Sequence, residues 1–548
     1  MKLVHGCALL MLVTLAATAA AADNSRPNIL YIFADDLSYR AISAYPEAYP
    51  FVDTPNIDRI AETGVRFEQA YIGAKCAPSR VGQRTGRFQY ATKLPGIDPA
   101  TAAGNWYKDL RANGYYNGMT GKWHWGDGPE SIGHGVSWDW SVVWDHGNKD
   151  SGGYYEGTMV RINGADPVPL GGYSTDRYSE LTVEFIKERA AEKNKPWFFW
   201  LCYGGVHSPY TPPPRHLQLY LDQPPTPMPV DVFGPRPNMP SHMQDFSSWT
   251  EENGEVLYKG KPHDFWVKQQ MQAVRAIDDG VGTILKALEE TGQLENTIVI
   301  FTTDQGYVWG EHGLKGKIWP YAAAIKSPLL ISNPKRFPAG KVCPAPVSGM
   351  DMVATFHALS GTEATMPLHG RDITPLLKQP ESKSVADEWN KTPTMMCYMY
   401  NRYEATEMAE KLKNNEWGSF CWTDPGNKGK KKKKKKANKN ISETLVEDVV
   451  DLDGVGGAAA DPTSETGHPN WFSLNDGQYK YIRYCYPDRI EELYDVRNDP
   501  DELNNLAVNQ ANEAILQKFR AALVTQLKAK NGEAFADLLP APAERWNE

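Results

Sequence analysis

The sequence contains few cysteines, no excess of positive charge and, beyond its N-terminus, no long apolar run. Seven cysteines among 548 residues are too few for a fold held together by disulfides. A formal net charge of −9 has the wrong sign for a protein that binds nucleic acid through its bulk surface. Without further apolar runs of about 18 residues, the chain is not a polytopic membrane protein. The composition, 41% hydrophobic and 23% charged, is that of a globular protein.

The N-terminus has the pattern of a secretory signal peptide. Lys2 and His5 precede an apolar stretch over residues 9–15, and small residues follow as far as Ala22. A basic region, a short apolar region and small residues, in this order, predict a signal peptide over residues 1–22. Because the apolar stretch is short for a membrane anchor, we expect a secreted or periplasmic protein. Export permits disulfides among the remaining six cysteines, and their pairing stays open.

Short apolar runs alternate with segments of helical periodicity along the chain. The expected strands are residues 28–33, 196–203, 297–303 and 479–484, and the expected helices are residues 54–64, 176–191, 267–291 and about 510–530. Strands that alternate with helices predict an α/β fold whose sheet is mostly parallel, with helices on both faces. Ligands of such sheets bind beyond the carboxyl ends of the strands. Asp35, Asp36 and Asp304 follow two of the expected strands, so we expect their carboxylates to converge.

Composition changes divide the chain further. The proline-rich residues 210–265 predict a surface excursion that borders the active site. We expect a catalytic domain over residues 23–384 and a smaller α+β subdomain over residues 385–548. The latter contains a lysine-rich loop, 428–439, with Lys428 and an unbroken run at 430–436. Adjacent lysines repel one another, which predicts a disordered loop; anchoring to a polyanion is the alternative interpretation.

One cysteine lies in a distinctive pattern. Residues 76–80 read C-A-P-S-R, and T-G-R follows at 85–87. A cysteine near basic side chains is a candidate nucleophile, although a structural role is the commoner interpretation of a lone cysteine. The pattern closely resembles the signature of the type I sulfatases. In that family a formylglycine-generating enzyme reads C-x-P-x-R and oxidises the cysteine to formylglycine (3-oxoalanine), so the resemblance implies this modification of Cys76.

Other segments resemble the same family. They are residues 26–36, 54–59, 114–124, 206–209, 303–317 and 492–506. The match at 114–124 is imperfect, because Asn117 and Thr120 replace commoner residues, and residues 136–175, 210–265 and 378–470 carry no family signal. The resemblance implies an alkaline-phosphatase-like sheet sandwiched by helices.

The resemblance also implies a metal site formed by Asp35, Asp36, Asp304 and Gln305 together with the modified Cys76. Carboxylate and amide oxygens suit a hard cation, which favours Ca²⁺, with Mg²⁺ as the alternative. Zinc is disfavoured because no histidine or thiolate belongs to the oxygen set. Gln305 stands where many relatives have Asn or His, and it favours sulfate over phosphate diesters.

The remaining implied roles concern charge and protons. The hydroxyl of the hydrated aldehyde at residue 76 attacks sulfur, and Arg80 stabilises the hydrate. Lys122 and Lys317 neutralise charge on the sulfate. His207 protonates the departing alcohol, and His124 removes the hydroxyl proton that lets sulfate leave. For His312, substrate contact and a structural role are both open.

These features predict a sulfatase that acts on a sulfated polysaccharide or its oligosaccharides. The tryptophans at 123, 125, 138, 140 and 144 suit stacking on sugars as well as core packing. One alternative is a phosphonate or phosphodiester hydrolase of the same superfamily. The other is a non-catalytic polyanion-binding protein that uses the lysine run.

Overall fold

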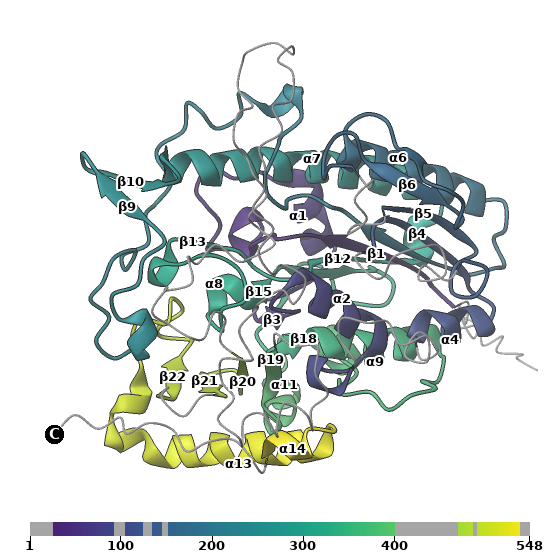
Figure 1. Ribbon diagram of the computed structural model, residues 1–548. Helices are drawn as coiled ribbons and strands as arrows, with labels where there is room; N and C mark the ends of the chain where they lie inside the picture. The colour runs from purple at the N-terminus through teal and green to yellow at the C-terminus, as the bar shows by residue number, and fades with distance from the viewer. Residues whose placement is uncertain are drawn as a thin grey trace, which may run out of the picture.

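The computed structural model describes residues 26–92, 105–123, 134–144, 152–399, 470–485 and 490–536 (Figure 1). The predicted signal peptide, His124, Trp125 and the lysine-rich loop lie outside these residues. Within the described ranges, no helix is long and apolar enough to cross a membrane.

A ten-stranded sheet forms the centre of the molecule. Its order is β17 (Lys341–Cys343), β2 (Gly64–Phe67), β16 (Leu329–Ser332), β12 (Thr297–Thr303), β1 (Asn28–Ala34), β8 (Trp197–Cys202), β4 (Tyr116–Lys122), β5 (Trp140–Trp144), β6 (Met159–Ile162) and β7 (Val168–Pro169). The strands from β12 to β5 are parallel, and β16 and β6 pair antiparallel with both neighbours. The prediction of a mostly parallel sheet is therefore confirmed.

Helices cover both faces of the sheet (Figure 1). One face carries α1 (Pro55–Glu62), α6 (Ser174–Arg189) and α7 (His263–Glu290), and the other carries α2 (Cys76–Thr85), α4 (Trp106–Ala112) and α9 (Gly349–Ser360). Side chains of β1 alternate between the two cores: Leu30 and Ile32 face the first, whereas Tyr31 and Phe33 face the second. A strand buried on both faces reads as a continuous apolar run, as residues 28–33 do.

A second, antiparallel sheet packs beside the ten-stranded sheet and its helices, which form the first unit of the structure. It contains β19 (Thr394–Tyr398), β20 (Trp471–Asn475), β21 (Tyr479–Tyr484) and β22 (Glu492–Asp495). One face packs on α13 (Glu513–Ala529) through Phe472 and Phe519. The other face, with Trp471 and Tyr484, packs on residues 318–325 of the first unit. The predicted smaller C-terminal sheet unit is thus present, and its inner face contacts the unit that contains the ten-stranded sheet.

The tryptophans of the central region belong mainly to the core. Trp138 is fully buried, and Trp123 and Trp144 are each only 2% exposed. Trp140 is half-buried and packs against Phe185. Core packing, rather than sugar stacking, is therefore the function of these four side chains.

His369 links the segment after α2 to the turn that follows α13. Its Nδ1 accepts a hydrogen bond from the Phe88 N–H (3.1 Å), and its Nε2 lies 3.2 Å from Asn531 Oδ1. Burial lowers the pKa of His369 to about 4. Protons therefore bind more tightly to the unfolded chain, and stability is lost as the pH falls from about 6.5 towards 4.

We expect this loss to be measurable against a variant that does not titrate. Between pH 7.5 and pH 5, the free energy of unfolding of the wild type should fall by about 2 kcal/mol more than that of His369→Asn. Urea unfolding at several pH values measures the difference. Parallel pH profiles for the two proteins would contradict the assignment.

Candidate active site

The candidate site lies at the carboxyl ends of four neighbouring parallel strands. In the sheet register, Ala34 of β1 is opposite Thr303 of β12, Phe33 is opposite Cys202 of β8, and Cys202 is opposite Gly121 of β4. The residues that follow these positions therefore emerge at one level. They bring Asp35, Asp304 and Lys122 to the same edge, as expected for an open α/β sheet.

The three predicted carboxylates converge at this edge. Asp35, Asp36 and Asp304 are all fully buried. The Asp36 N–H donates to Asp304 Oδ1 (3.1 Å), and the Gln305 amide donates to Asp36 Oδ1. Asp36 adopts a left-handed backbone conformation (φ 53°), which aspartate and asparagine tolerate better than most residues.

Two buried basic side chains, those of Arg80 and Lys122, neutralise part of the negative charge of these carboxylates. The Arg80 guanidinium donates to Asp35 Oδ2 (2.9 Å) and to Asp304 Oδ2 (3.1 and 3.2 Å). Lys122 Nζ lies 2.6 Å from Asp35 Oδ2. Burial alone would raise the pKa of Asp35, but Lys122 and Arg80 outweigh burial and hold it well below its usual range. Burial and the neighbouring Asp35 charge raise the pKa of Asp304 instead.

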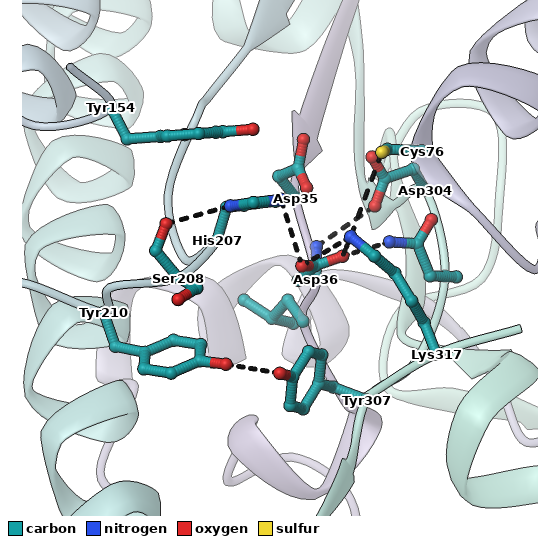
Figure 2. Close-up of polar contacts among 12 residues, drawn as sticks. Asp35, Asp36, Cys76, Tyr154, His207, Ser208, Tyr210, Asp304, Tyr307 and Lys317 are labelled. Carbon is teal, nitrogen blue, oxygen red and sulfur yellow. Dashed lines mark hydrogen bonds and ion pairs between the residues drawn. The ribbon is translucent and has the colours of Figure 1, made fainter. Parts of the chain in front are cut away.

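Lys317 links the carboxylates to the cysteine. Its Nζ donates to both oxygens of Asp36 (2.7 and 2.8 Å) and lies 3.9 Å from Cys76 Sγ (Figure 2). Cys76 is the first residue of α2, and the residue is only 5% exposed. Burial raises the pKa of the Cys76 thiol despite the nearby Lys317. Burial at this site therefore disfavours the thiolate form of the unmodified side chain.

His207 faces the same carboxylates from the loop after β8. Its Nε2 lies 3.7 Å from Asp36 Oδ2, and its ring stacks on Tyr154 with centroids 4.1 Å apart and an angle of 3° (Figure 2). Burial and the charge of Lys317 lower the pKa of His207. The ring therefore lies within the site, in an orientation fixed by stacking.

The oxygen atoms of the site are suitable ligands for a divalent cation. In the described part of the chain, Asp35 Oδ1 and Gln305 Oε1 are buried without a hydrogen-bond partner. Unpartnered buried oxygens are costly unless a ligand satisfies them. Ligand atoms of Asp35, Asp36 and His207 also lie within 4.8 Å of one another. His207 is thus close enough to join the set, although the sequence analysis assigned it only an acid role.

His312 is held by contacts that do not involve the carboxylate cluster. Its Nδ1 lies 2.7 Å from Asp231 Oδ2, its N–H donates to Asp231 Oδ1 (3.0 Å), and its ring packs on Tyr321 with centroids 4.3 Å apart. Asp231 comes from the excursion 210–265. These contacts account for the conformation of His312 and support the structural interpretation of its role.

Sequence reasoning missed Tyr154. The side chain covers His207 and accepts a hydrogen bond from Lys122 Nζ through its hydroxyl group (3.1 Å). Tyr154 lies in the segment 136–175, which has neither periodicity nor family signal. Only the folded structure places this residue against the site.

We expect Tyr154 to support activity through these two contacts. Tyr154→Phe removes the bond to Lys122 but keeps the ring, and it should lower kcat/KM about fivefold. Tyr154→Leu should cost more, because it also removes the stack on His207. Tyr45→Phe is the control: its hydroxyl bonds the backbone at Phe67, so the change should lower stability while kcat/KM is retained.

Comparison with known proteins agrees with this geometry. Residues 27–362 match the family model described as "Sulfatase", and residues 310–420 match "N-sulphoglucosamine sulphohydrolase, C-terminal". An N-acetylglucosamine-6-O-sulfatase of Bacteroides thetaiotaomicron is 29% identical over 436 residues, covering 69% of this chain and 75% of the relative. Arylsulfatase A of Bos taurus is 28% identical over 390 residues, covering 67% and 70%.

Solved structures share the fold at lower identity. A protein in complex with its substrate D-glucosamine-2-N,6-O-disulfate has a TM-score of 0.67 at 22% identity and covers 93% of this chain and 99% of its own. A phosphonate monoester hydrolase of Agrobacterium radiobacter has a TM-score of 0.61 at 18% identity, covering 92% and 96%. The family match spans more than half of the chain and includes the whole candidate site. The chain therefore belongs to the sulfatase family and is a sulfuric ester hydrolase.

Proposed function

We propose that this sulfatase removes sulfate from a sulfated carbohydrate, with Cys76 as the site of the nucleophile. The observation that carries the proposal is the meeting of Cys76, Lys317 and Asp36 at the carboxyl edge of the sheet. Relatives that act on sulfated glucosamine support a glycosaminoglycan or a related oligosaccharide as substrate.

Two groups that the family uses would complete the site. Formylglycine at position 76 would supply, as its hydrate, the hydroxyl that attacks the sulfur of the ester. A divalent cation, for which we propose Ca²⁺, would polarise the sulfate oxygens and would be held by Asp35, Asp36, Asp304 and Gln305 together with residue 76.

The charged side chains then have separate roles. Lys317 and Lys122 neutralise the negative charge that builds up on the sulfate group in the transition state. Arg80 holds Asp35 and Asp304 in place and orients the modified side chain one helical turn away. His207 gives a proton to the leaving alcohol oxygen, and we propose His124 as the base that restores the aldehyde.

The balance of charges in the site agrees with an anionic substrate. Three carboxylates, Asp35, Asp36 and Asp304, are matched by Arg80, Lys122 and Lys317. A divalent cation adds two positive charges. A sulfate monoester and one ionised hydroxyl would balance them, so a buried, neutral complex results when substrate is bound.

We also propose export of the chain through the signal peptide over residues 1–22. The mature protein then consists of a catalytic domain ending near residue 384 and a C-terminal subdomain from residue 385. A formylglycine-generating enzyme would act on Cys76 before folding completes, because the side chain is buried in the folded protein.

The test is sulfate release from sulfated glycosaminoglycans and their oligosaccharides. The protein is co-expressed with a formylglycine-generating enzyme, and mass spectrometry of the peptide that contains residue 76 confirms the modification. Release of sulfate supports the proposal and identifies the substrate class. Turnover of phosphonate or phosphate esters without any sulfate release, by fully modified enzyme, would overturn it in favour of the alternative hydrolase.

A further inference from the structure

The segment after Lys317 is held by the C-terminal sheet and by the loop that follows its last strand. Trp471 Nε1 of β20 donates to the Ile318 carbonyl (2.8 Å), and Lys480 Nζ of β21 donates to the Pro320 carbonyl (2.6 Å). Glu502 Oε2 accepts from the Ala322 N–H (2.6 Å). Three successive points of this segment are therefore fixed by side chains that lie far away in the sequence.

The side chains that make these bonds are all buried, and two of them also pair with each other. Trp471 and Glu502 are fully buried, and Lys480 is 1% exposed. Lys480 Nζ and Glu502 Oε1 form an ion pair of 2.5 Å. A buried ion pair adds little net stability compared with apolar side chains of similar size. Its geometry, with each partner also bonded to the segment after Lys317, indicates a role in fixing position.

The backbone at Ile318 needs such support. Ile318 has φ 82°, a region in which a β-branched residue is a genuine outlier. Backbone of this kind persists only where surrounding contacts determine it, and it concentrates at functional sites. The Ile318 N–H also donates to the Ala74 carbonyl (2.9 Å), two residues before Cys76. Ile318 therefore ties the Lys317 segment to the segment that presents the cysteine.

We propose that Trp471, Lys480 and Glu502 are positioning residues for Lys317. They hold the strained turn at Ile318, and the turn aims the Lys317 ammonium group between Asp36 and Cys76. The C-terminal sheet thereby completes the active site without contacting substrate. This inference rests on the proposed role of Lys317 in sulfate ester hydrolysis.

A purely structural role would predict a different outcome from a positioning role. Loss of a structural contact lowers stability and affects the enzyme whether or not Lys317 is present. Loss of a positioning contact lowers kcat only while Lys317 is there to be positioned. A double-mutant cycle between Trp471 and Lys317 separates the two cases.

The cycle uses Trp471→Phe, Lys317→Ala and the double variant, all as full-length enzyme with residue 76 modified. Phenylalanine keeps the aromatic packing and removes the indole donor. We expect Trp471→Phe to lower kcat about tenfold, because small displacements of a catalytic group are costly. Lys317→Ala should lower kcat at least about 100-fold, in the range seen when a transition-state donor is removed. In the Lys317→Ala background, Trp471→Phe should change kcat less than about twofold.

A second measurement makes the result independent of turnover. Hydrogen exchange of the peptide over residues 315–322 should be faster in Trp471→Phe than in the wild type. The same double-mutant cycle is measured with Glu502→Gln in place of Trp471→Phe, so the inference can still be tested if one of the two variants does not fold. Trp389→Phe is the matched control, because the Trp389 indole also donates to a backbone carbonyl, at Pro346 (2.7 Å); kcat should be retained.

The outcomes distinguish the inference from the proposed function. If Lys317→Ala retains full activity, the assigned role of Lys317 is wrong. If Lys317→Ala loses activity but the two changes multiply, Trp471 acts only on general stability and the positioning role is overturned. Unchanged exchange over residues 315–322 in Trp471→Phe would overturn it as well.

Discussion

Cys76→Ala is expected to abolish sulfate release. The residue opens α2, 3.9 Å from Lys317 Nζ, and alanine can neither be converted to formylglycine nor provide a nucleophile. Removal of a covalent nucleophile should lower kcat at least about 1,000-fold. The measurement is sulfate release from the best substrate of the glycosaminoglycan panel, with Cys76→Ala and wild type produced under the same conditions.

Two other variants determine the reason for the loss. Cys76→Ser keeps a single hydroxyl but should also be inactive in turnover, because it lacks the second hydroxyl that restores the site. Cys343→Ala is the matched control, since Cys343 is a fully buried free thiol in β17; it should lose stability and keep kcat. Substantial turnover by Cys76→Ala would contradict the formylglycine mechanism.

The sequence predicts the sheet well where a strand is buried on both faces. Residues 297–303 and 479–484 are strands with the expected bounds, as β12 and β21. The helix expected from residue 267 begins four residues earlier, at His263. The apolar periodicity does not reveal this start, because the first turn contains polar and aromatic residues. The helix expected over residues 54–64 is α1, Pro55–Glu62; Thr54 precedes it, and its hydroxyl oxygen accepts from the Ser43 N–H (2.9 Å) rather than from the helix.

The sequence predicts those residues of the candidate site that directly follow a strand. Asp35, Asp36 and Asp304 follow β1 and β12 directly, so parallel pairing brings them together. Tyr154 and Trp471 reach the site region from segments whose local pattern contains no catalytic signal. Their positions depend on tertiary packing, which spacing along a single sequence does not encode. The described cysteines are likewise all free thiols, an outcome that the cysteine count alone left open.

Asp36→Asn is the second change for which we expect a large effect. Asp36 contacts more of the site than its neighbours do: Lys317, His207 and Gln305 all reach its carboxylate. Asparagine has the same shape and tolerates the left-handed backbone, so the fold should be retained. The loss of one negative ligand should lower activity more than about 100-fold and weaken cation binding.

Cation binding provides a readout that does not depend on turnover. A ligand that binds only the folded state raises the melting temperature. Ca²⁺ should therefore raise the Tm of chelator-treated wild type and restore its sulfate release, and both effects should be absent in Asp36→Asn.

Asp58→Asn is the control for the loss of a partly buried carboxylate. Asp58 accepts its bonds from Ser43 and Thr54, outside the site, so this variant should keep the response to Ca²⁺. A Tm shift of equal size in Asp36→Asn and the wild type would place the cation elsewhere. Restoration by Mg²⁺ but not Ca²⁺ would keep the site and change the ion. A comparison of the two variants thus separates the electrostatic requirement at the sheet edge from the general cost of losing a hydrogen-bonded carboxylate.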